Sequence, residues 1–371
     1  MSSSRIDATG AAIPFTFDGR RHEGRAGDTI ASALLAAGVR IVGRSFKYHR
    51  PRGIWGAWTE EPNALVDVTV DGRTTPNLRA TTEPLLAGMA VRSVNAHPTA
   101  EGDRGAFLDR FSAFIPSGFY YKTFLWPDWH LFEPRIRAMA GLGRLDPDNR
   151  PAADWPQINA SCDVLVIGAG PAGLAAAKAA AGAGKSVILV DDRPQPGGSL
   201  LHRGGTVDGM PGAEWAASNV GELAAAGHRV LTDTTAYGIY DHDLVCAWQR
   251  RPGRADAQWK IRPKRIVVAA GAIERPLVFA DNDRPGVMSA DAALFYLRRH
   301  GVLVGSRVVV AANNSSAAAV AAALADAGAT VTLAELRPDA TAPEGVALRK
   351  GVTVEAVHGR RGVEAVTVGG E

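Results

Sequence analysis

Residues 164–173 read VLVIGAGPAG, and this stretch decides the fold of the chain. Four apolar residues lead into glycines spaced as GxGxxG at Gly168, Gly170 and Gly173, and an alanine-rich run follows them. A strand, a tight turn and a helix over residues 172–183 are therefore expected. In that context the glycine spacing indicates a βαβ unit that binds a dinucleotide. Gly168 permits the turn, Gly170 the approach of a pyrophosphate, and Gly173 the close packing of helix on strand.

Acidic residues follow the next predicted strand, which spans residues 187–190. Asp191 and Asp192 lie about 20 residues beyond the glycines, where an acidic side chain accepts hydrogen bonds from the ribose hydroxyls of a dinucleotide. The same charge disfavours a 2′-phosphate, so NAD or FAD is expected rather than NADP. The amino end of the helix offers unpaired N–H groups and a positive dipole to the phosphates. This βαβ unit contributes a first set of candidate site residues: Gly168, Gly170, Pro171, Ala172, Gly173, Asp191, Asp192 and Arg193.

Two later segments extend the candidate site. Residues 194–199 hold a glycine pair that lets the chain run close to a pyrophosphate, although a plain loop is the alternative. Residues 266–272 predict a strand that ends in small residues. Both segments resemble the GG and ATG motifs of two-dinucleotide-binding-domain flavoproteins such as thioredoxin reductase. The resemblance implies that small strand-end residues pass beside the dinucleotide and that the backbone at 234–236 reads the adenine, which adds Gly197, Gly198, Ser199, Thr235, Ala236, Ala270 and Gly271.

A second βαβ unit is expected to begin near Gly305, but its turn lacks glycine. Residues 311–317 read AANNSSA, where the corresponding turn of those flavoproteins carries a second GxGxxG. Cβ atoms at these positions would crowd a pyrophosphate, so the second nucleotide site is predicted to be lost or altered. No CxxC lies between the two units, and the chain therefore lacks the usual parts for a hydride relay or thiol exchange.

Composition and charge narrow the possible functions. A chain of 371 residues is too long for one ordinary core and fits roughly two or three domains. The 41 basic and 38 acidic residues leave a net charge of +3 without a long basic run, which argues against nucleic acid as a partner. The apolar stretches are too short to span a bilayer, so a soluble cytoplasmic protein is expected. Cys162 and Cys246 lack CxxC spacing, which excludes a disulfide framework and a cysteine-based metal site, and both are predicted to be inert. A single disulfide between them is the alternative, which a reducing compartment disfavours.

The predicted fold class is α/β: a Rossmann-type two-dinucleotide-binding-domain fold preceded by a small β-grasp (ferredoxin-like) α+β domain. Residues 1–98 form the first domain. It combines a hairpin at Asp18-Gly19, a helix over residues 29–38 with Asp28 as its N-cap and Gly38 at its end, and a strand over residues 66–70 before Asp71-Gly72.

Residues 99–160 follow as an aromatic-rich arm and a proline-rich linker. The arm either packs on its own chain or forms a docking surface for another subunit, since exposed aromatic patches mark interfaces. Residues 161–304 are assigned to the first dinucleotide-binding domain, and residues 305–371 to the start of an inserted second nucleotide-type domain. Further strands are expected at 228–232, 265–269, 307–311 and 330–334. The aromatic residues of the arm are Phe107, Phe111, Phe114, Phe119, Tyr120, Tyr121, Phe124, Trp126, Trp129 and Phe132.

Four segments give a more specific resemblance than the glycines. They are residues 44–53 (RSFKYHRPRG), 60–66 (EEPNALV), 275–279 (RPLVF) and 282–288 (NDRPGVM). Together they closely resemble the alpha subunit of heterotetrameric sarcosine oxidase, and the resemblance covers nearly the entire chain. The basic loop within them, residues 44–52, either contacts a phosphate or an acidic partner or is solvated or paired within the chain.

Relatives of the first domain in opine, proline and hydroxyproline dehydrogenases carry a two-iron, two-sulfur cluster. Its cysteines lie in the segment that corresponds to about residues 53–66, where this chain has Trp55, Trp58, Pro62 and Val66 and no cysteine. The resemblance therefore implies that no cluster forms and that no metal site is present, as in the sarcosine oxidase branch.

The resemblance implies a demethylating oxidase whose chemistry lies on other chains. Sarcosine would be oxidised at FAD in the beta subunit, and electrons would pass to FMN, which lies at the interface with the beta subunit, before they reach oxygen. Hydrogen peroxide would form, and tetrahydrofolate would capture the methyl carbon. The alpha subunit would bind NAD without using it in substrate oxidation, beside beta, gamma and delta subunits. No catalytic residue is therefore assigned to this chain.

Three other functions stay open. An alpha subunit of a related opine, proline or hydroxyproline dehydrogenase is disfavoured by the missing cysteines. A stand-alone FAD-dependent NADH oxidoreductase would carry FAD on this chain. A scaffold would hold a dinucleotide only to shape a partner interface. Family alpha subunits also continue beyond residue 371 through a folate domain, so a fragment or truncated product with uncovered apolar surface is expected.

Overall fold

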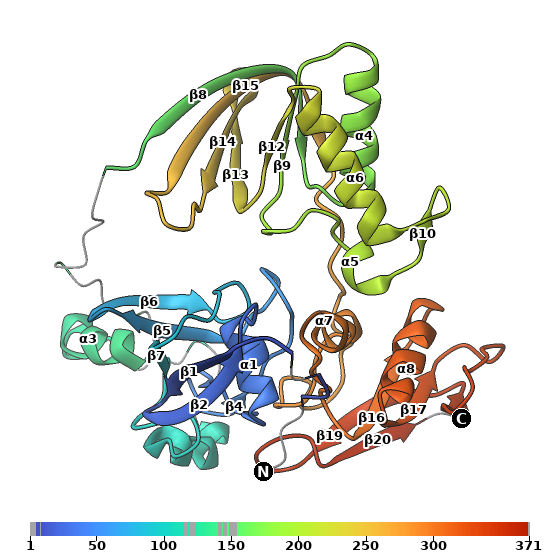
Figure 1. The fold of residues 1–371 in the computed structure, drawn as a ribbon. Helices are drawn as coiled ribbons and strands as arrows, with labels where there is room; N and C mark the ends of the chain where they lie inside the picture. The colour runs from blue at the N-terminus through green and yellow to red at the C-terminus, as the bar shows by residue number, and fades with distance from the viewer. Residues whose placement is uncertain are drawn as a thin grey trace. The chain divides into compact units, whose positions relative to one another are not determined.

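The computed structural model describes residues 5–7, 9–114, 118, 124–139, 143, 147 and 154–369. The chain divides into two compact units, with unit 1 formed by Met1–Asn149 together with Glu274–Glu371, and unit 2 by Arg150–Ile273 (Figure 1). Among the residues that the structure describes, buried apolar side chains form two clusters in unit 1 and two in unit 2. Both units therefore have the cores that independent folding requires.

Unit 1 begins with a five-stranded sheet in the order β2-β1-β7-β5-β6, drawn in blue in Figure 1. β1 runs parallel to β7, and the other neighbours are antiparallel. Both hairpins turn at an Asp-Gly pair with positive φ at each residue, a pattern whose twist suits paired strands. The predicted β-grasp is thereby confirmed. Its elements are β1 (Ala12–Phe17), β2 (Arg20–Arg25), α1 (Ile30–Ala36), β3 (Gly43–Arg44), β4 (Pro51–Arg52), β5 (Leu65–Val70), β6 (Arg73–Arg79) and β7 (Ala90–Ser93).

Helix α1 is capped by Thr29, so the prediction of Asp28 as its N-cap is wrong. The Thr29 hydroxyl accepts a hydrogen bond from the Ser32 N–H at 3.2 Å, and the Ser32 hydroxyl accepts one from the Thr29 N–H at 3.0 Å. These two bonds form a capping box. The Asp28 carboxylate is used elsewhere, because it accepts hydrogen bonds from the Arg5 guanidinium at 2.5 Å and the Ser32 hydroxyl at 2.7 Å. Because Asp28 pairs with Arg5, a residue distant in sequence, its carboxylate does not cap the helix.

Lowering the pH should reduce the free energy of unfolding of unit 1, because Asp28 becomes protonated. Burial alone would raise the pKa of this carboxyl, but hydrogen bonds from His300, Ser32, the Arg25 backbone and Arg5 outweigh burial and hold its pKa below the ordinary value. A depressed folded-state pKa stabilises the protein above the ordinary pKa, and this stability is lost as the pH falls through the folded value. We expect Asp28→Asn to flatten the fall in the free energy of unfolding between about pH 5 and pH 2.

The control for this prediction is Asp71→Asn, which makes the same chemical change on an exposed turn. Its acid profile should keep the slope of the unsubstituted chain. An unchanged slope in Asp28→Asn would contradict the role given to this carboxylate.

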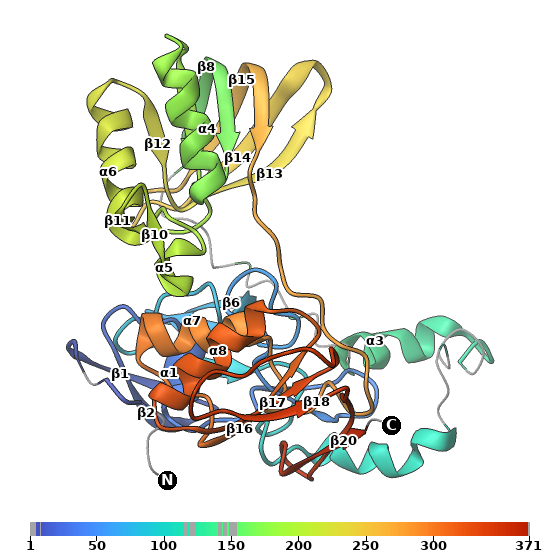
Figure 2. The same ribbon diagram turned by 90° about the vertical axis from the view of Figure 1, so that its right-hand side faces the viewer.

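Helix α7 joins the N-terminal sheet to a second βαβ unit within unit 1. Phe295 and Tyr296 belong to the core of the N-terminal sheet, whereas Leu294 and Leu297 belong to the core formed with α8. Residues 274–304 therefore group with unit 1, unlike the predicted division at residue 304. Helix α8 lies on the sheet β16-β17-β18 and beside α7 (Figure 2). The elements are α7 (Ala290–His300), β16 (Arg307–Ala312), α8 (Ser316–Asp326), β17 (Thr330–Glu335), β18 (Ala347–Lys350), β19 (Thr353–His358) and β20 (Ala365–Gly369).

The basic loop 44–52 is paired within the chain. The Nδ1 atom of His49 lies 2.6 Å from the Asp103 carboxylate, and the Arg50 guanidinium lies 2.6 Å from that of Asp109. Asp103 precedes the 3-10 helix η1 (Arg104–Phe114) and Asp109 lies within it, so the loop holds the start of the arm. Of the alternatives that the sequence left open for this loop, pairing within the chain is the one found.

The arm leaves large apolar side chains exposed. Phe107 and Phe111 meet edge to face with ring centroids 6.4 Å apart, yet both remain at least half exposed. Trp126 is 85% exposed and precedes helix α3 (Trp129–Met139). The docking surface stays a prediction, and Phe119, Tyr120 and Tyr121 lie outside the described residues, as do positions 148–153 of the predicted linker and the last two residues of the chain.

Unit 2 is the predicted Rossmann-type unit. Its sheet has the order β12-β9-β8-β15-β14-β13, in which the first four strands are parallel and the last two antiparallel. Helices α4 and α6 cover one face of the parallel part (Figure 2). The elements are β8 (Gln157–Ile167), α4 (Pro171–Gly182), β9 (Val187–Val190), α5 (Leu200–Arg203), β10 (Thr206–Val207), β11 (Met210–Pro211), α6 (Gly212–Ala225), β12 (Arg229–Leu231), β13 (Thr234–Tyr240), η2 (Asp241–Asp243), β14 (Leu244–Gln249) and β15 (Ala257–Val268).

The cysteines of unit 2 have free thiols. Cys162 on β8 and Cys246 on β14 are both buried and unpaired with each other. Burial raises the pKa of the Cys162 thiol, which keeps it protonated and poorly nucleophilic. Among the described helices of both units, none has the length and apolar character of a membrane span.

Candidate dinucleotide site

The glycine-rich turn lies between β8 and α4, and two of its glycines are required by the fold itself. Gly168 has φ +102°, and a Cβ there would collide with the carbonyl oxygen of Ala269 after β15. A Cβ on Gly173 would collide with the carbonyl oxygen of Gly168. The roles predicted for these positions, a tight turn and close helix packing, agree with this geometry.

Gly170 differs from the other two, because the protein's own packing does not require a glycine there. Its backbone is extended, with φ −72° and ψ −177°, a conformation open to any residue. A Cβ on Gly170 would touch only the Cα of Gly198, at an ordinary 3.9 Å. Helix α4 starts next with Pro171 in its first turn, and no side chain caps it. The turn therefore presents a bare backbone surface and the positive end of a helix dipole.

The predicted glycine pair lies against this turn. Gly197 and Gly198 have φ of +129° and +54°, so both take backbone conformations that favour glycine. The Gly197 N–H donates to the Ala169 carbonyl at 2.8 Å, and a Cβ on Gly198 would lie 2.9 Å from the Cα of Gly170. The two glycine segments therefore form one continuous backbone surface. Ser199 follows as the residue before α5.

Asp191 lies where the sequence predicted it, at the carboxyl end of β9, but its carboxylate already has backbone partners. It is buried and accepts hydrogen bonds from the N–H of Ala169 at 2.5 Å and of Arg193 at 2.9 Å. Burial raises the pKa of Asp191, while these two N–H groups oppose that rise. Asp191 thus fixes the glycine turn to the second strand, and Asp192 and Arg193 are half-buried beside it. The ribose contact of the acids stays a prediction.

The remaining candidates come from the carboxyl end of β15 and the amino end of β13. The Cα of Ala270 lies 3.2 Å from a Cβ built on Gly168, and Gly271 follows it on the exposed carboxyl side of β15. Thr235 and Ala236 lie on β13, and the preceding Thr234 donates its N–H to the Asp191 carbonyl at 2.7 Å. The structure therefore brings together the ends of the strands that carry the predicted residues.

Sequence reasoning missed one residue of this turn, Ala169. It is fully buried, donates its N–H to the Asp191 carboxylate and accepts the Gly197 N–H. It joins the first glycine segment, the acid and the second glycine segment. The signal was present as the alanine between the first two glycines, but side-chain identity does not reveal backbone partners.

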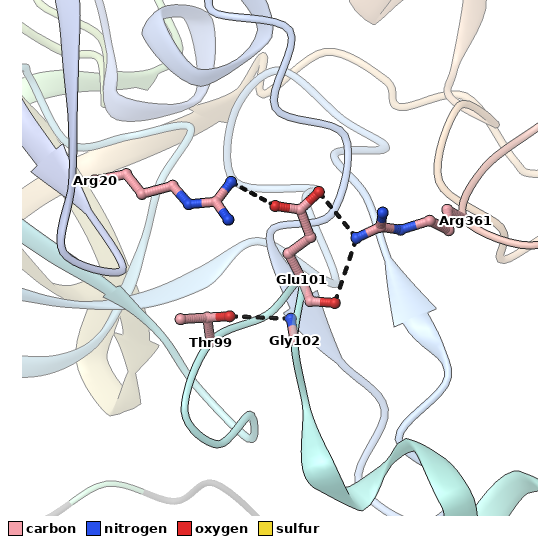
Figure 3. A pocket seen from close by; sticks show the side chains of 5 residues that line it. All are labelled: Arg20, Thr99, Glu101, Gly102 and Arg361. Carbon is pink, nitrogen blue, oxygen red and sulfur yellow. Dashed lines mark hydrogen bonds and ion pairs between the residues drawn. The ribbon is translucent and has the colours of Figure 1, made fainter.

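A hollow in unit 1 does not resemble a nucleotide site. About 290 Å³ is lined by Arg20, Thr99, Glu101, Gly102 and Arg361 (Figure 3). Glu101 pairs with Arg20 at 2.7 Å and with Arg361 at 2.9 Å, and all three side chains are substantially exposed. Exposed pairs of this kind contribute little stability, and the Glu101 carboxylate offsets one of the two arginine charges that would attract an anion.

The family comparisons agree with this division of the chain. Residues 162–368 match the model of the pyridine nucleotide-disulphide oxidoreductases, which is more than half of the chain. The chain belongs to this family. Residues 10–96 match a 2Fe-2S iron-sulfur cluster binding domain. Among the described residues, no three His, Cys, Asp or Glu side chains are grouped to hold a metal ion.

Relatives of this oxidoreductase confirm the predicted resemblance. The sarcosine oxidase alpha subunit of Rhizobium meliloti (strain 1021) is 48% identical over 323 residues, which cover 82% of this chain and 33% of that protein. The sarcosine oxidase alpha subunit of Corynebacterium sp. (strain P-1) is 38% identical, over 95% of this chain and 33% of that protein. An opine oxidase subunit of Rhizobium meliloti (strain 1021) is 30% identical, over 40% of this chain and 32% of that protein. The chain spans about a third of the length of these relatives.

A solved structure supports the fold. L-proline dehydrogenase from P. horikoshii superposes with a TM-score of 0.65 at 21% identity, over 100% of this chain and 60% of that chain. The predicted fold class, a two-dinucleotide-binding-domain fold behind a ferredoxin-like domain, is confirmed.

Proposed function

We propose that unit 2 of this oxidoreductase binds NAD through the backbone surface formed by residues 168–173 and 197–199. Gly170 carries the proposal. Its conformation suits any residue and its Cβ would touch only one atom at 3.9 Å, so the fold gives no reason for a glycine there. The close approach of a pyrophosphate gives one. The space beside Gly170, which a side chain would fill, is thus left free for a ligand.

The residues around Gly170 would bind the dinucleotide and orient it. The first N–H groups of α4 and the helix dipole would hold the phosphates. The acidic pair Asp191 and Asp192 would favour ribose hydroxyls and disfavour a 2′-phosphate. Ala270 and Gly271 would leave room for the dinucleotide to pass, and the backbone of Thr235 and Ala236 would face the adenine. NAD supplies hydride chemistry when it is bound, but we assign no catalytic residue to this chain.

We further propose that the chain is the NAD-binding alpha-type subunit of a sarcosine-oxidase-like enzyme. The 48% identity to the alpha subunit of a sarcosine oxidase supports this assignment. In such an enzyme sarcosine would be demethylated at FAD on a beta subunit, FMN would lie at the interface with that subunit, and tetrahydrofolate would accept the methylene group while hydrogen peroxide forms. Beta, gamma and delta subunits would be the partners, in the cytoplasm.

The nucleotide released from the purified chain should be NAD. We expect about one NAD per chain when protein purified with its co-expressed partner subunits is denatured and the supernatant is analysed by mass spectrometry. FAD from the beta subunit is expected in the same sample, so the recovery of FAD without any NAD would contradict the NAD assignment. Recovery of no nucleotide at all would contradict the site.

A further inference from the structure

The resemblance to cluster-carrying relatives implies that metal ligands would lie in about residues 53–66, and this chain has no cysteine there. The match spans residues 10–96, while the two cysteines of the chain are Cys162 and Cys246. A two-iron, two-sulfur cluster needs four protein ligands, cysteines in its ferredoxin form. The residues present do not fit the cluster, and something else must hold this loop in shape.

A buried carboxylate holds it. Glu61 is 1% exposed. One of its oxygens accepts the N–H groups of Trp55 at 2.7 Å and Gly56 at 2.6 Å, and the other accepts those of Asn63 at 2.6 Å and Ala64 at 2.9 Å. Four backbone donors from both sides of the loop thus converge on one side chain. Hydrogen bonds to an ionised acceptor are about twice as strong as neutral ones.

The neighbouring Glu60 strengthens the same arrangement. Its carboxylate accepts the N–H groups of Ala57 at 2.7 Å and Trp58 at 3.0 Å. The two acids therefore satisfy backbone donors in the loop that the strands of the sheet do not reach. A loop with this many internal partners has a defined shape without a metal.

The outer side of this loop holds helix α7. The hydroxyl of Tyr296, which is fully buried, donates to the Gly56 carbonyl at 2.9 Å. The Ser289 N–H donates to the Trp55 carbonyl at 2.9 Å. Trp55 and Gly56 therefore have their N–H groups on Glu61 and their carbonyls on α7 or its N-cap. The residues whose N–H groups bind Glu61 are therefore the ones whose carbonyls accept hydrogen bonds from α7 and its N-cap.

We propose that the Glu61 carboxylate holds the conformation of loop 53–64 in place of an iron–sulfur cluster. The ferredoxin-like domain then serves as a packing surface for α7 and does not carry electrons through a cluster. This packing surface also stabilises the second βαβ unit, because Leu294 and Leu297 of α7 pack on α8. Residues 10–96 then provide no iron–sulfur relay for electrons.

Glu61→Gln tests whether this carboxylate holds the loop that contacts α7. The amide places an NH2 group against two backbone N–H donors, so one half of the centre becomes repulsive. Hydrogen exchange measured by mass spectrometry on the full chain should become at least about tenfold faster in peptides of α7, more than 200 residues away in sequence. The matched control is Glu23→Gln on β2, whose side chain is 60% exposed and forms an ion pair with Arg25, two residues away. Its α7 exchange should match the unsubstituted chain.

Two further measurements keep the proposal testable if Glu61→Gln does not fold. Tyr296→Phe removes only the hydroxyl that reaches Gly56, and it should speed exchange in residues 53–64. The unsubstituted chain, incubated anaerobically with ferrous iron and sulfide and then desalted, should retain no stoichiometric iron or acid-labile sulfide. Unchanged exchange in α7 of a folded Glu61→Gln, unchanged exchange of the loop in Tyr296→Phe, or an assembled cluster would each overturn the proposal.

Discussion

Gly168→Ala should prevent unit 2 from folding while the N-terminal sheet of unit 1 stays folded. Gly168 has φ +102°, which strains any residue with a Cβ, and the new Cβ would collide with the Ala269 carbonyl oxygen. That carbonyl belongs to the backbone following β15, and β15 pairs with β8 over most of its length, so it cannot yield without disturbing the centre of the sheet. We expect a loss of at least about 4 kcal/mol in the free energy of unfolding, a value that is rare for a point substitution.

Hydrogen exchange in peptides of β8, α4 and β9 would report this loss, with peptides of β1 and β5 as an internal reference. The control is Gly221→Ala in the exposed interior of α6, where a Cβ meets nothing within 4 Å. Gly to Ala in a helix should raise stability by about 0.5–1 kcal/mol. Native exchange of β8 in Gly168→Ala would contradict the geometry of the turn. The two substitutions are chemically identical, so their opposite signs isolate the backbone effect.

Much of unit 2 could be predicted because its determinants are local in sequence. The strand Val187–Val190 is a run of four apolar residues, all of which are buried. Helix α4 begins one residue before its predicted start because proline is well suited to the first turn. The strands β8 and β15 extend farther toward their amino ends than predicted, since they pair with each other in a region where polar residues alternate with apolar ones.

Features that depend on distant partners could not be predicted in the same way. Asp28 resembles an N-cap in sequence, but Arg5 and His300 lie beside it in the fold and Thr29 caps the helix. No helix was predicted over residues 290–300, and the side chains of α7 belong to two different cores. Glu61 gave no sequence signal, because its four partners are backbone N–H groups that no residue type marks.

The same limit applies to the candidate site, where the residues were predicted and some of their roles were not. Asp191 was expected as a ribose ligand, yet its carboxylate also fixes the turn through the N–H of Ala169. A substitution of Asp191 would therefore disturb the fold and the ligand together. Gly170 separates the two effects, because the protein around it tolerates a Cβ.

Gly170→Ala should weaken retention of the dinucleotide without a change in the free energy of unfolding. The methyl group would occupy the surface on which the pyrophosphate is proposed to lie, and overpacking of this kind costs about 1–3 kcal/mol, which is about a 5- to 150-fold loss of affinity. Gly170→Val should bind more weakly still. The measurement is the amount of nucleotide released on denaturation per folded chain, with the thermal unfolding profile recorded on the apoprotein so that a lost ligand does not appear as a lost fold.

Gly182→Ala is the matched control, since Gly182 lies at the far end of the same helix and a Cβ there meets nothing within 4 Å. It should retain the nucleotide in full. Full retention by Gly170→Ala would show that no ligand approaches this backbone, and the proposed site would then have to be abandoned even if the chain carries NAD elsewhere. A loss that grows with side-chain size at Gly170, in a chain whose apoprotein unfolds normally, is explained only by a ligand in contact with the turn, because the fold itself leaves that space open.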